Sequence, residues 1–161
     1  MAELRFIQDF PAKGVKFIDI SPKLTDKNDF KAIIDEMTSK VPANTDYIIA
    51  PESRGYIFGT AMAIALDVGF VPIRKPGKLP EDLVLTVEYE KEYGKDRLCL
   101  PKNENYEGKN FYFVDDVLAT GGTLNAAKEL VEKASGNFVG AGVYINIKAL
   151  NNLDVNSVEN L

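Results

Sequence analysis

An acidic pair followed by a glycine-containing turn is the segment of this chain best suited to chemistry. Residues 111–127 read FYFVDDVLATGGTLNAA, in which Asp115 and Asp116 follow a short apolar run. Glycine lets backbone N–H groups approach an anion closely, and the start of a following helix adds partial positive charge. We therefore expect the turn to hold a phosphate, and the two carboxylates to bind ribose hydroxyls or to face a hydrated Mg²⁺. The expected phosphate-binding residues are Ala119, Thr120, Gly121, Gly122 and Thr123.

Two other nucleotide-binding folds place acidic or glycine-rich turns after strands, and neither fits. The G-x-x-x-x-G-K-[ST] pattern of a P-loop ATPase occurs nowhere in the 161 residues, and the G-x-G-x-x-G of a dinucleotide fold is also absent. A purely structural turn between a strand and a helix stays open, because α/β proteins contain many such connections. The two acids argue against that reading, since ligands of open α/β sheets bind at the carboxyl ends of strands.

Composition excludes several classes of function. The chain is 45% hydrophobic and 27% charged, which is typical of one globular domain, and its formal net charge is −5. No cluster of lysine and arginine is large enough to follow a nucleic-acid backbone, so we expect no DNA or RNA partner. We also expect a cytoplasmic protein without a membrane partner, because the N-terminal sequence has charges among its apolar residues and no long apolar run follows.

The chemistry available to this chain is narrowed by two residue types. There is no histidine, and the single cysteine, Cys99, lies in an alternating apolar segment where a packed strand thiol is expected. Any reaction must therefore use carboxylates, amines, hydroxyls, the backbone or a metal ion.

Apolar periodicity predicts alternating strands and helices. This alternation predicts an α/β fold with a mostly parallel twisted sheet flanked by helices on both faces. Two strand-like segments, 84–89 and 97–100, interrupt the alternation, and we interpret them as an antiparallel pair that forms a flexible flap over the site. The expected strands are residues 47–50, 70–73, 111–114 and 138–147, and the expected helices are about residues 30–41, 56–66 and a helix that Thr123 caps, that runs to about Ala134 and that Gly136 closes.

The amino-acid sequence of the acidic turn resembles a motif of a known family. V-D-D-V-L-A-T-G-G-T is similar to the phosphoribosyl pyrophosphate (PRPP) loop of the type I phosphoribosyltransferases, and within them of the adenine phosphoribosyltransferases. The resemblance extends from about Ile7 to Leu150. It implies a single phosphoribosyltransferase domain over residues 1–161, with a small N-terminal hood at about 1–25 and the flap at about 78–100. It also implies Mg²⁺ bound with PRPP and a homodimeric assembly.

Two further segments resemble the pyrophosphate side of the family's site. Residues 51–55, Pro-Glu-Ser-Arg-Gly, lie between a strand and a helix, where an arginine can fork onto phosphate oxygens. Residues 74–80 carry three cations and no acid, which suits a polyanionic ligand in a negatively charged protein. A surface arginine and a solvated basic loop are the alternatives. By resemblance, the pyrophosphate-binding residues are Glu52, Ser53, Arg54, Arg74, Lys75 and Lys78.

The expected catalytic residue is Glu92. The segment Glu92-Tyr93-Gly94 resembles the E-Y-G of adenine phosphoribosyltransferases, in which the glutamate is the proposed acid/base at the purine. Members that act on 6-oxopurines typically carry an aspartate immediately before T-G, whereas this chain has Ala119. Without that aspartate and without histidine, a flap glutamate whose pKa is raised on closure is the best remaining proton carrier. An ordinary exposed loop glutamate is the alternative.

The N-terminal segment, residues 7–20, is similar to the hood of the same family. The resemblance implies that Phe17 stacks on adenine and that the backbone near Lys16 reads the edge of the base, with a core aromatic as the alternative for Phe17. Ile18 departs from the pattern, since many members have arginine or lysine there. At the other end, Asn146 stands where a glutamate is usual, and Asn151-Asn152 replaces a Gly-Arg-x-Lys-Leu segment.

Together these residues predict purine salvage, in which a 5-phosphoribosyl group passes from PRPP to adenine and gives AMP and pyrophosphate. Two alternatives stay open because of the departures. One is a transferase for hypoxanthine, guanine or xanthine, and the other is a PRPP-binding regulator without catalysis.

Overall fold

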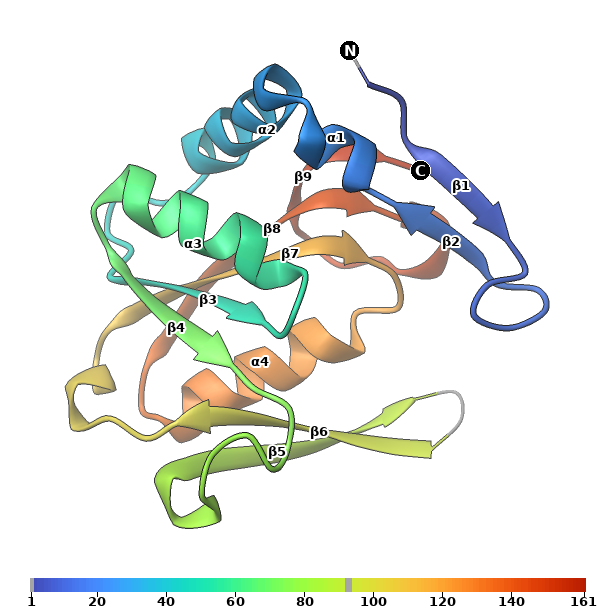
Figure 1. Cartoon of the computed structure of the whole chain (residues 1–161). Coiled ribbons are helices and arrows are strands. Elements are labelled where there is room, and N and C mark those ends of the chain that lie inside the picture. The colour runs from blue at the N-terminus through green and yellow to red at the C-terminus, as the bar shows by residue number, and fades with distance from the viewer. Residues whose placement is uncertain (1, 92–93) are drawn as a thin grey trace. The chain divides into compact units, whose positions relative to one another are not determined.

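A computed structural model describes residues 2–91 and 94–161, and its elements are shown in Figure 1. Glu92 and Tyr93 lie outside the described residues, so the expected catalytic glutamate has no structural account. The chain divides into two compact units, Met1–Glu36 and Met37–Leu161. The first unit is longer than the hood expected at about residues 1–25, and a single domain with those hood and flap boundaries stays a prediction.

The first unit contains an antiparallel hairpin followed by helices. Strand β1 (Arg5–Gln8) pairs with β2 (Lys16–Asp19), and the short helix α1 (Ser21–Thr25) has a proline in its first turn, where the missing N–H removes no helical hydrogen bond. Helix α2 (Lys27–Ser39) begins in this unit. The Asp26 side chain accepts hydrogen bonds from the N–H groups of Asn28 and Asp29 and so caps the start of this helix.

The second unit is built on a parallel sheet, as the alternation of elements predicts. All of its neighbouring strands are parallel, and helices α3 (Gly55–Leu66) and α4 (Gly122–Lys133) cover opposite faces (Figure 1). The buried apolar runs of the central strands fit this two-sided cover. In spatial order the strands are β4 (Gly69–Ile73), β3 (Tyr47–Pro51), β7 (Asn110–Leu118), β8 (Asn137–Asn146) and β9 (Asn156–Asn160).

The central strand and the helix after it differ from expectation in three details. β7 continues to Leu118, so Asp115 and Asp116 lie inside the strand rather than after it. Gly121, and not Thr123, is the N-cap of α4, because its φ of 90° makes the turn that a residue with a Cβ rarely adopts. At the other end of α4, Ser135 takes the left-handed conformation expected of Gly136. Gly136 is needed instead because a Cβ there would lie 2.6 Å from the Phe111 ring.

The expected flap strands form one antiparallel hairpin. β5 (Val84–Lys91) pairs with β6 (Gly94–Pro101), and Arg74 extends the pairing by exchanging backbone hydrogen bonds with Cys99. Cys99 is a buried free thiol in β6, which confirms the packed strand thiol that the sequence predicts. Short 3₁₀ turns lie at Glu81–Leu83, Glu104–Tyr106 and Lys148–Leu150.

One hydrophobic core joins the sheet, α4 and the base of the hairpin. Phe113 from β7, Leu130 from α4 and Leu100 from β6 are members of the same buried cluster. The hairpin is therefore anchored at its base rather than attached as a free arm. No helix among residues 2–91 and 94–161 is long and apolar enough to cross a bilayer.

Candidate active site

The register of the sheet gathers three of the expected segments at one edge. Pro51 of β3 lies beside Ile73 of β4, and Ile49 of β3 lies beside Phe113 of β7. Three segments follow these positions. They are the loop 52–55, called the pyrophosphate loop below, the basic segment 74–80, called the basic strip, and the acidic pair Asp115 and Asp116. Since parallel strands bring their carboxyl ends to the same edge, the sheet itself assembles the site.

Arg54 and Asp116 form the contact between the pyrophosphate loop and the acidic pair. Arg54 is the N-cap of α3, and its Nε lies 2.9 Å from Oδ2 of Asp116. The Asp116 side chain is only 4% exposed, and this oxygen accepts no hydrogen bond from the described residues. The cation therefore offsets a buried negative charge where directed hydrogen bonds are lacking.

Asp115 is partly buried beside the more deeply buried Asp116. Burial, followed by the charge of Asp116, raises the pKa of Asp115 well above its ordinary value, while the Asp116 N–H and the Arg54 charge act in the opposite direction. The Asp116 N–H donates to Oδ1 of Asp115 at 2.9 Å. Gly55 allows the same carboxylate to approach α3, because a Cβ there would lie 2.9 Å from Oδ1. Asp115 is thus held against α3 beside a second carboxyl, where its oxygens can hydrogen-bond to a ligand hydroxyl.

Glu52 connects the pyrophosphate loop to the basic strip. Its Oε1 lies 3.2 Å from Nε of Arg74, and its Oε2 accepts from the N–H of Lys75 at 3.4 Å. Burial and the Glu52 charge raise the pKa of Tyr56 to about 12, so this phenol stays protonated and donates to the Ile73 carbonyl at 2.8 Å. Glu52 therefore holds Arg74 in the basic strip, whereas Ser53 and Lys78 are exposed at the surface.

The turn after β7 presents a row of N–H donors. In the described part of the chain, the N–H groups of Thr120, Gly121, Gly122 and Thr123 donate to no protein acceptor, and the first helical bond runs from Asn125 to Gly121. Donors without partners at the positive end of an α-helix form an anion site. The turn thus has free donors at a helix start, and its phosphate-binding role stays a prediction.

Two segments border the turn: the hairpin, which the sequence predicts as a flap over the site, and the segment after β8, which sequence reasoning did not identify. A Cβ on Gly122 would lie 3.3 Å from the Tyr89 ring of β5, so the hairpin packs against one side. A Cβ on Gly121 would lie 2.2 Å from Leu153, which follows the sheet's β8 strand. The Asn151 amide donates to the Ala119 carbonyl at 2.7 Å. The replacement of a family segment by Asn151-Asn152 was the only sequence signal near these contacts.

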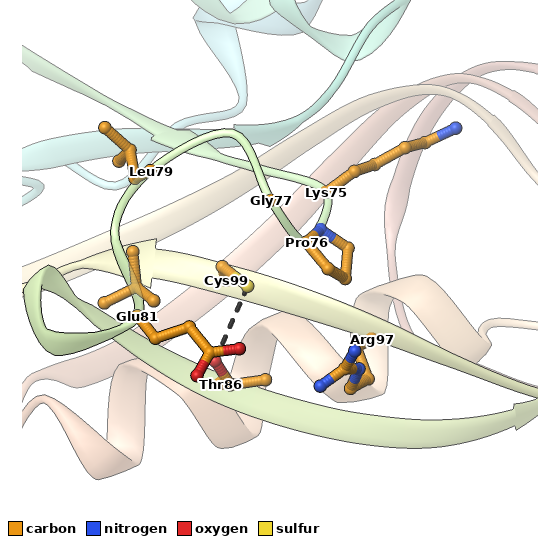
Figure 2. Close-up of a pocket in the computed structure, with 9 residues that line it drawn as sticks. Lys75, Pro76, Gly77, Leu79, Glu81, Thr86, Arg97 and Cys99 are labelled. Atoms are coloured by element: carbon orange, nitrogen blue, oxygen red, sulfur yellow. Dashed lines mark hydrogen bonds between the residues drawn. The ribbon is translucent and has the colours of Figure 1, made fainter.

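A small pocket lies between the 75–81 loop and the hairpin (Figure 2). Its volume of about 20 Å³ is enough for roughly one water molecule. Figure 2 shows the Lys75 side chain extending away from Cys99 and Thr86, so its ammonium group lies outside this pocket. The pocket is too small for a purine or a sugar phosphate.

The expected adenine-binding residues lie in the hairpin of the first unit. Phe17 contacts the Phe10 ring edge-to-face at 5.3 Å, and Lys16 Nζ lies 4.3 Å from the centre of the Phe6 ring. Ile18 is buried. These contacts describe the first unit alone, and the adenine-binding role of Lys16 and Phe17 stays a prediction.

The acidic pair fits a magnesium ion that arrives with a phosphorylated ligand. The described residues contain no cluster of three metal-ligating side chains. Mg²⁺ commonly keeps several waters and uses one or two carboxylates together with substrate phosphates. Asp115 and Asp116 supply two such carboxyls, and Oδ2 of Asp116 has no hydrogen-bond partner among the described residues.

Comparison with known proteins agrees with this geometry. Residues 21–156 match the family model of the phosphoribosyl transferase domain. The adenine phosphoribosyltransferase of Thermosipho africanus is 45% identical over 159 residues, which cover 98% of this chain and 93% of that protein. That of a Thermoanaerobacter species is 49% identical over 134 residues, covering 83% and 77%.

Solved structures agree at the level of the fold. The adenine phosphoribosyltransferase of Thermoanaerobacter pseudethanolicus has a TM-score of 0.90 at 40% identity, covering 98% of this chain and 95% of that one. The Saccharomyces cerevisiae enzyme, solved with an imino-altritol bisphosphate and adenine, has a TM-score of 0.83 at 37% identity, covering 96% and 92%. The chain therefore belongs to the phosphoribosyltransferase family, and within it to the adenine phosphoribosyltransferases.

The buried Asp115 predicts a pH-dependent stability. Its pKa is 3.8 in the absence of shifts and higher in the folded protein, so above pH 4 or so the folded state binds more protons than the unfolded state. This carboxyl therefore lowers stability as pH rises through the folded pKa. We expect Asp115→Asn to raise the melting temperature at pH 7, with a gain that shrinks as pH falls toward 4.

The measurement is thermal unfolding of both proteins between pH 4 and pH 8. Asp82→Asn, which changes an exposed aspartate, is the control and should follow the wild type. Melting curves for Asp115→Asn that run parallel to the wild type at every pH would contradict the assignment.

Proposed function

We propose that this protein transfers a 5-phosphoribosyl group from PRPP to adenine, forming AMP and pyrophosphate. The observation that carries the proposal is the row of unpartnered N–H groups at Thr120–Thr123 beside the carboxyls of Asp115 and Asp116. A ligand with a phosphate next to vicinal hydroxyls matches this pair of subsites. The curated relatives named above are adenine phosphoribosyltransferases, and Ala119 lacks the carboxylate typical of members that use 6-oxopurines.

The leaving group would be received by cations at the same edge of the sheet. Breaking the bond between C1′ and the pyrophosphate oxygen leaves negative charge on the departing oxygen. Arg54 and Arg74 are at hand, with Lys75 and Lys78 on the adjoining loop. Arg54 is paired with Asp116 and Arg74 with Glu52, so pyrophosphate binding exchanges one anionic partner for another. Before the substrate arrives, the two carboxylates hold Arg54 and Arg74 in place.

The rest of PRPP, its ribose and 5′-phosphate, would be held at the end opposite the pyrophosphate. The turn at Thr120–Thr123 binds the 5′-phosphate, and Asp115 and Asp116 bind the ribose hydroxyls. Binding of the phosphate and of the ribose hydroxyls fixes C1′ close to the attacking ring nitrogen of adenine. This positioning lowers the barrier of a reaction whose transition state resembles an oxocarbenium ion. Mg²⁺, when bound with PRPP near the two aspartates, would add positive charge on the pyrophosphate.

The base requires a proton carrier and a binding surface. As the new bond forms, the attacking ring of adenine loses a proton, and Glu92 is proposed to accept it. Phe17 and the backbone near Lys16 are proposed to hold the base. Water must be kept from the cationic sugar, which gives the β5–β6 hairpin its function as a flap. A cytoplasmic location stays a prediction from the sequence.

A homodimer is proposed from the surface of α3. This helix is apolar all round, and Ile57 and Ile64, seven positions apart on one face, are 38% and 83% exposed. A helix apolar on every side is normally covered on every side. A second copy of this chain, packed on that face, would supply the missing cover.

The base preference can be tested directly. With Mg²⁺ and PRPP, adenine should be converted to its nucleotide much faster than hypoxanthine, guanine or xanthine, as chromatography of the products would show. Equal or faster use of hypoxanthine would overturn the choice of substrate. Binding of PRPP in a calorimeter without any nucleotide product would instead indicate a regulator.

The proposed proton carrier gives a second test. Glu92→Ala should lower kcat by roughly 100-fold or more, because general acid–base catalysis typically contributes that much. The KM for PRPP should stay within about twofold, since the residue is assigned to the base and not to the sugar phosphate. Glu90→Ala, a neighbouring flap carboxylate, is the matched control with near-normal kcat. Unchanged turnover in Glu92→Ala would remove this residue from the mechanism.

The proposed dimer face gives a third test. Ile64→Glu should shift the 17.8 kDa chain toward a monomer in sedimentation velocity, because a charge would be buried at the interface. The change should leave the monomer's fold intact, as this side chain is 83% exposed. Leu83→Glu changes another exposed aliphatic side chain, away from α3, and should stay dimeric. A dimer unaffected by Ile64→Glu would place the interface elsewhere.

A further inference from the structure

The segment after β8 returns to the phosphate-holding turn and contacts it through a side-chain amide. Nδ2 of Asn151 donates to the Ala119 carbonyl at 2.7 Å, to Oδ1 of Asn146 at 3.0 Å and to the Ile147 carbonyl at 3.2 Å. Two N–H groups serve three acceptors, so one of them is shared. Asn146 is 3% exposed and lies beside Leu118 in the β7–β8 register. One amide therefore joins the end of β7, which carries the acidic pair, to the end of its neighbour β8.

The Asn151 side chain is itself held in place. Its Oδ1 accepts from the N–H of Leu153 at 3.1 Å, which closes a local turn around the side chain. Leu153 then packs over Gly121, where a Cβ would lie 2.2 Å from its Cδ1. The amide and the leucine thus contact the turn at two points, two residues apart in each segment.

The hydrogen bond to Ala119 has a consequence for the next N–H group. The peptide between Ala119 and Thr120 is trans and planar, so its C=O and N–H point in opposite directions. With the carbonyl directed at Asn151, the Thr120 N–H points to the opposite side of the turn. That N–H has no acceptor within the described residues and is the first of the row that starts at the turn.

We propose that Asn151 is a positioning residue for the phosphate subsite. By holding the Ala119–Thr120 peptide in one orientation, it keeps the Thr120 N–H directed at the 5′-phosphate of the sugar. The inference rests on the proposed function of the turn and adds a residue to it. Asn151 does not touch the substrate, and its effect is confined to ligands that carry the sugar phosphate.

The test compares two ligands that occupy different parts of the site. Ribose 5-phosphate probes the turn, and pyrophosphate probes the cations at Arg54 and Arg74. Asn151→Ala should weaken ribose 5-phosphate binding by about tenfold in titration calorimetry, the scale of one lost hydrogen bond at a binding site, and raise the KM for PRPP to a similar extent. Binding of pyrophosphate and the KM for adenine should stay as in the wild type.

Two further variants define the interaction. Asn151→Asp keeps the acceptor for the Leu153 N–H but loses the donor to Ala119, so it should not restore ribose 5-phosphate binding. Asn152→Ala changes the exposed neighbouring asparagine and is the matched control, with binding of both ligands unchanged.

Three outcomes would overturn the assignment. Wild-type binding of ribose 5-phosphate by Asn151→Ala would show that the amide does not position the turn. Equal weakening of both ligands, together with a lower melting temperature, would show a general structural role. Failure of the wild-type protein to bind ribose 5-phosphate at all would remove the phosphate subsite itself, and the positioning role with it.

Discussion

The parallel register of β3, β4 and β7 is the constraint on which the rest of the site depends. It sets the loop after Pro51 beside Arg74 on one side and beside Asp115 and Asp116 on the other. Each of the three strands carries buried apolar side chains, so a slip by one residue would expose core side chains and is strongly disfavoured. The positions of the charged groups are therefore fixed by hydrophobic packing and not by their own attractions.

The charged side chains at this edge of the sheet are arranged in pairs of opposite charge. Arg54 lies on Asp116 and Arg74 on Glu52, so each cation assigned to pyrophosphate already has a carboxylate partner. Partners of this kind offset the desolvation of buried charge and hold long side chains in defined positions. The balance also limits affinity, because a polyphosphate gains only the difference between its own attraction and that of the carboxylate it displaces.

Sequence patterns predicted the elements well where apolar periodicity is strong, and missed features set by three-dimensional contact. The parallel sheet, α3, α4 and the hairpin follow from periodicity, and the buried Cys99 from its alternating neighbours. The end of β7 was wrong because a carboxylate normally marks a strand's end, whereas here Arg54 makes a buried Asp116 tolerable. Thr123 was wrong as a cap because only the structure shows that Gly121 takes a left-handed turn. Asn151 acts across 32 residues of sequence, beyond the reach of any local pattern.

Because this chain contains no histidine, the shifted pKa of the Asp115 carboxyl has a further consequence. Histidine is the side chain whose unshifted pKa lies between pH 5 and 8, and this chain has none. Among the described residues, burial and the charge of Asp116 raise the pKa of the Asp115 carboxyl well above its ordinary value. The group whose protonation the fold has altered is therefore a carboxyl at the sheet edge itself, and not an imidazole.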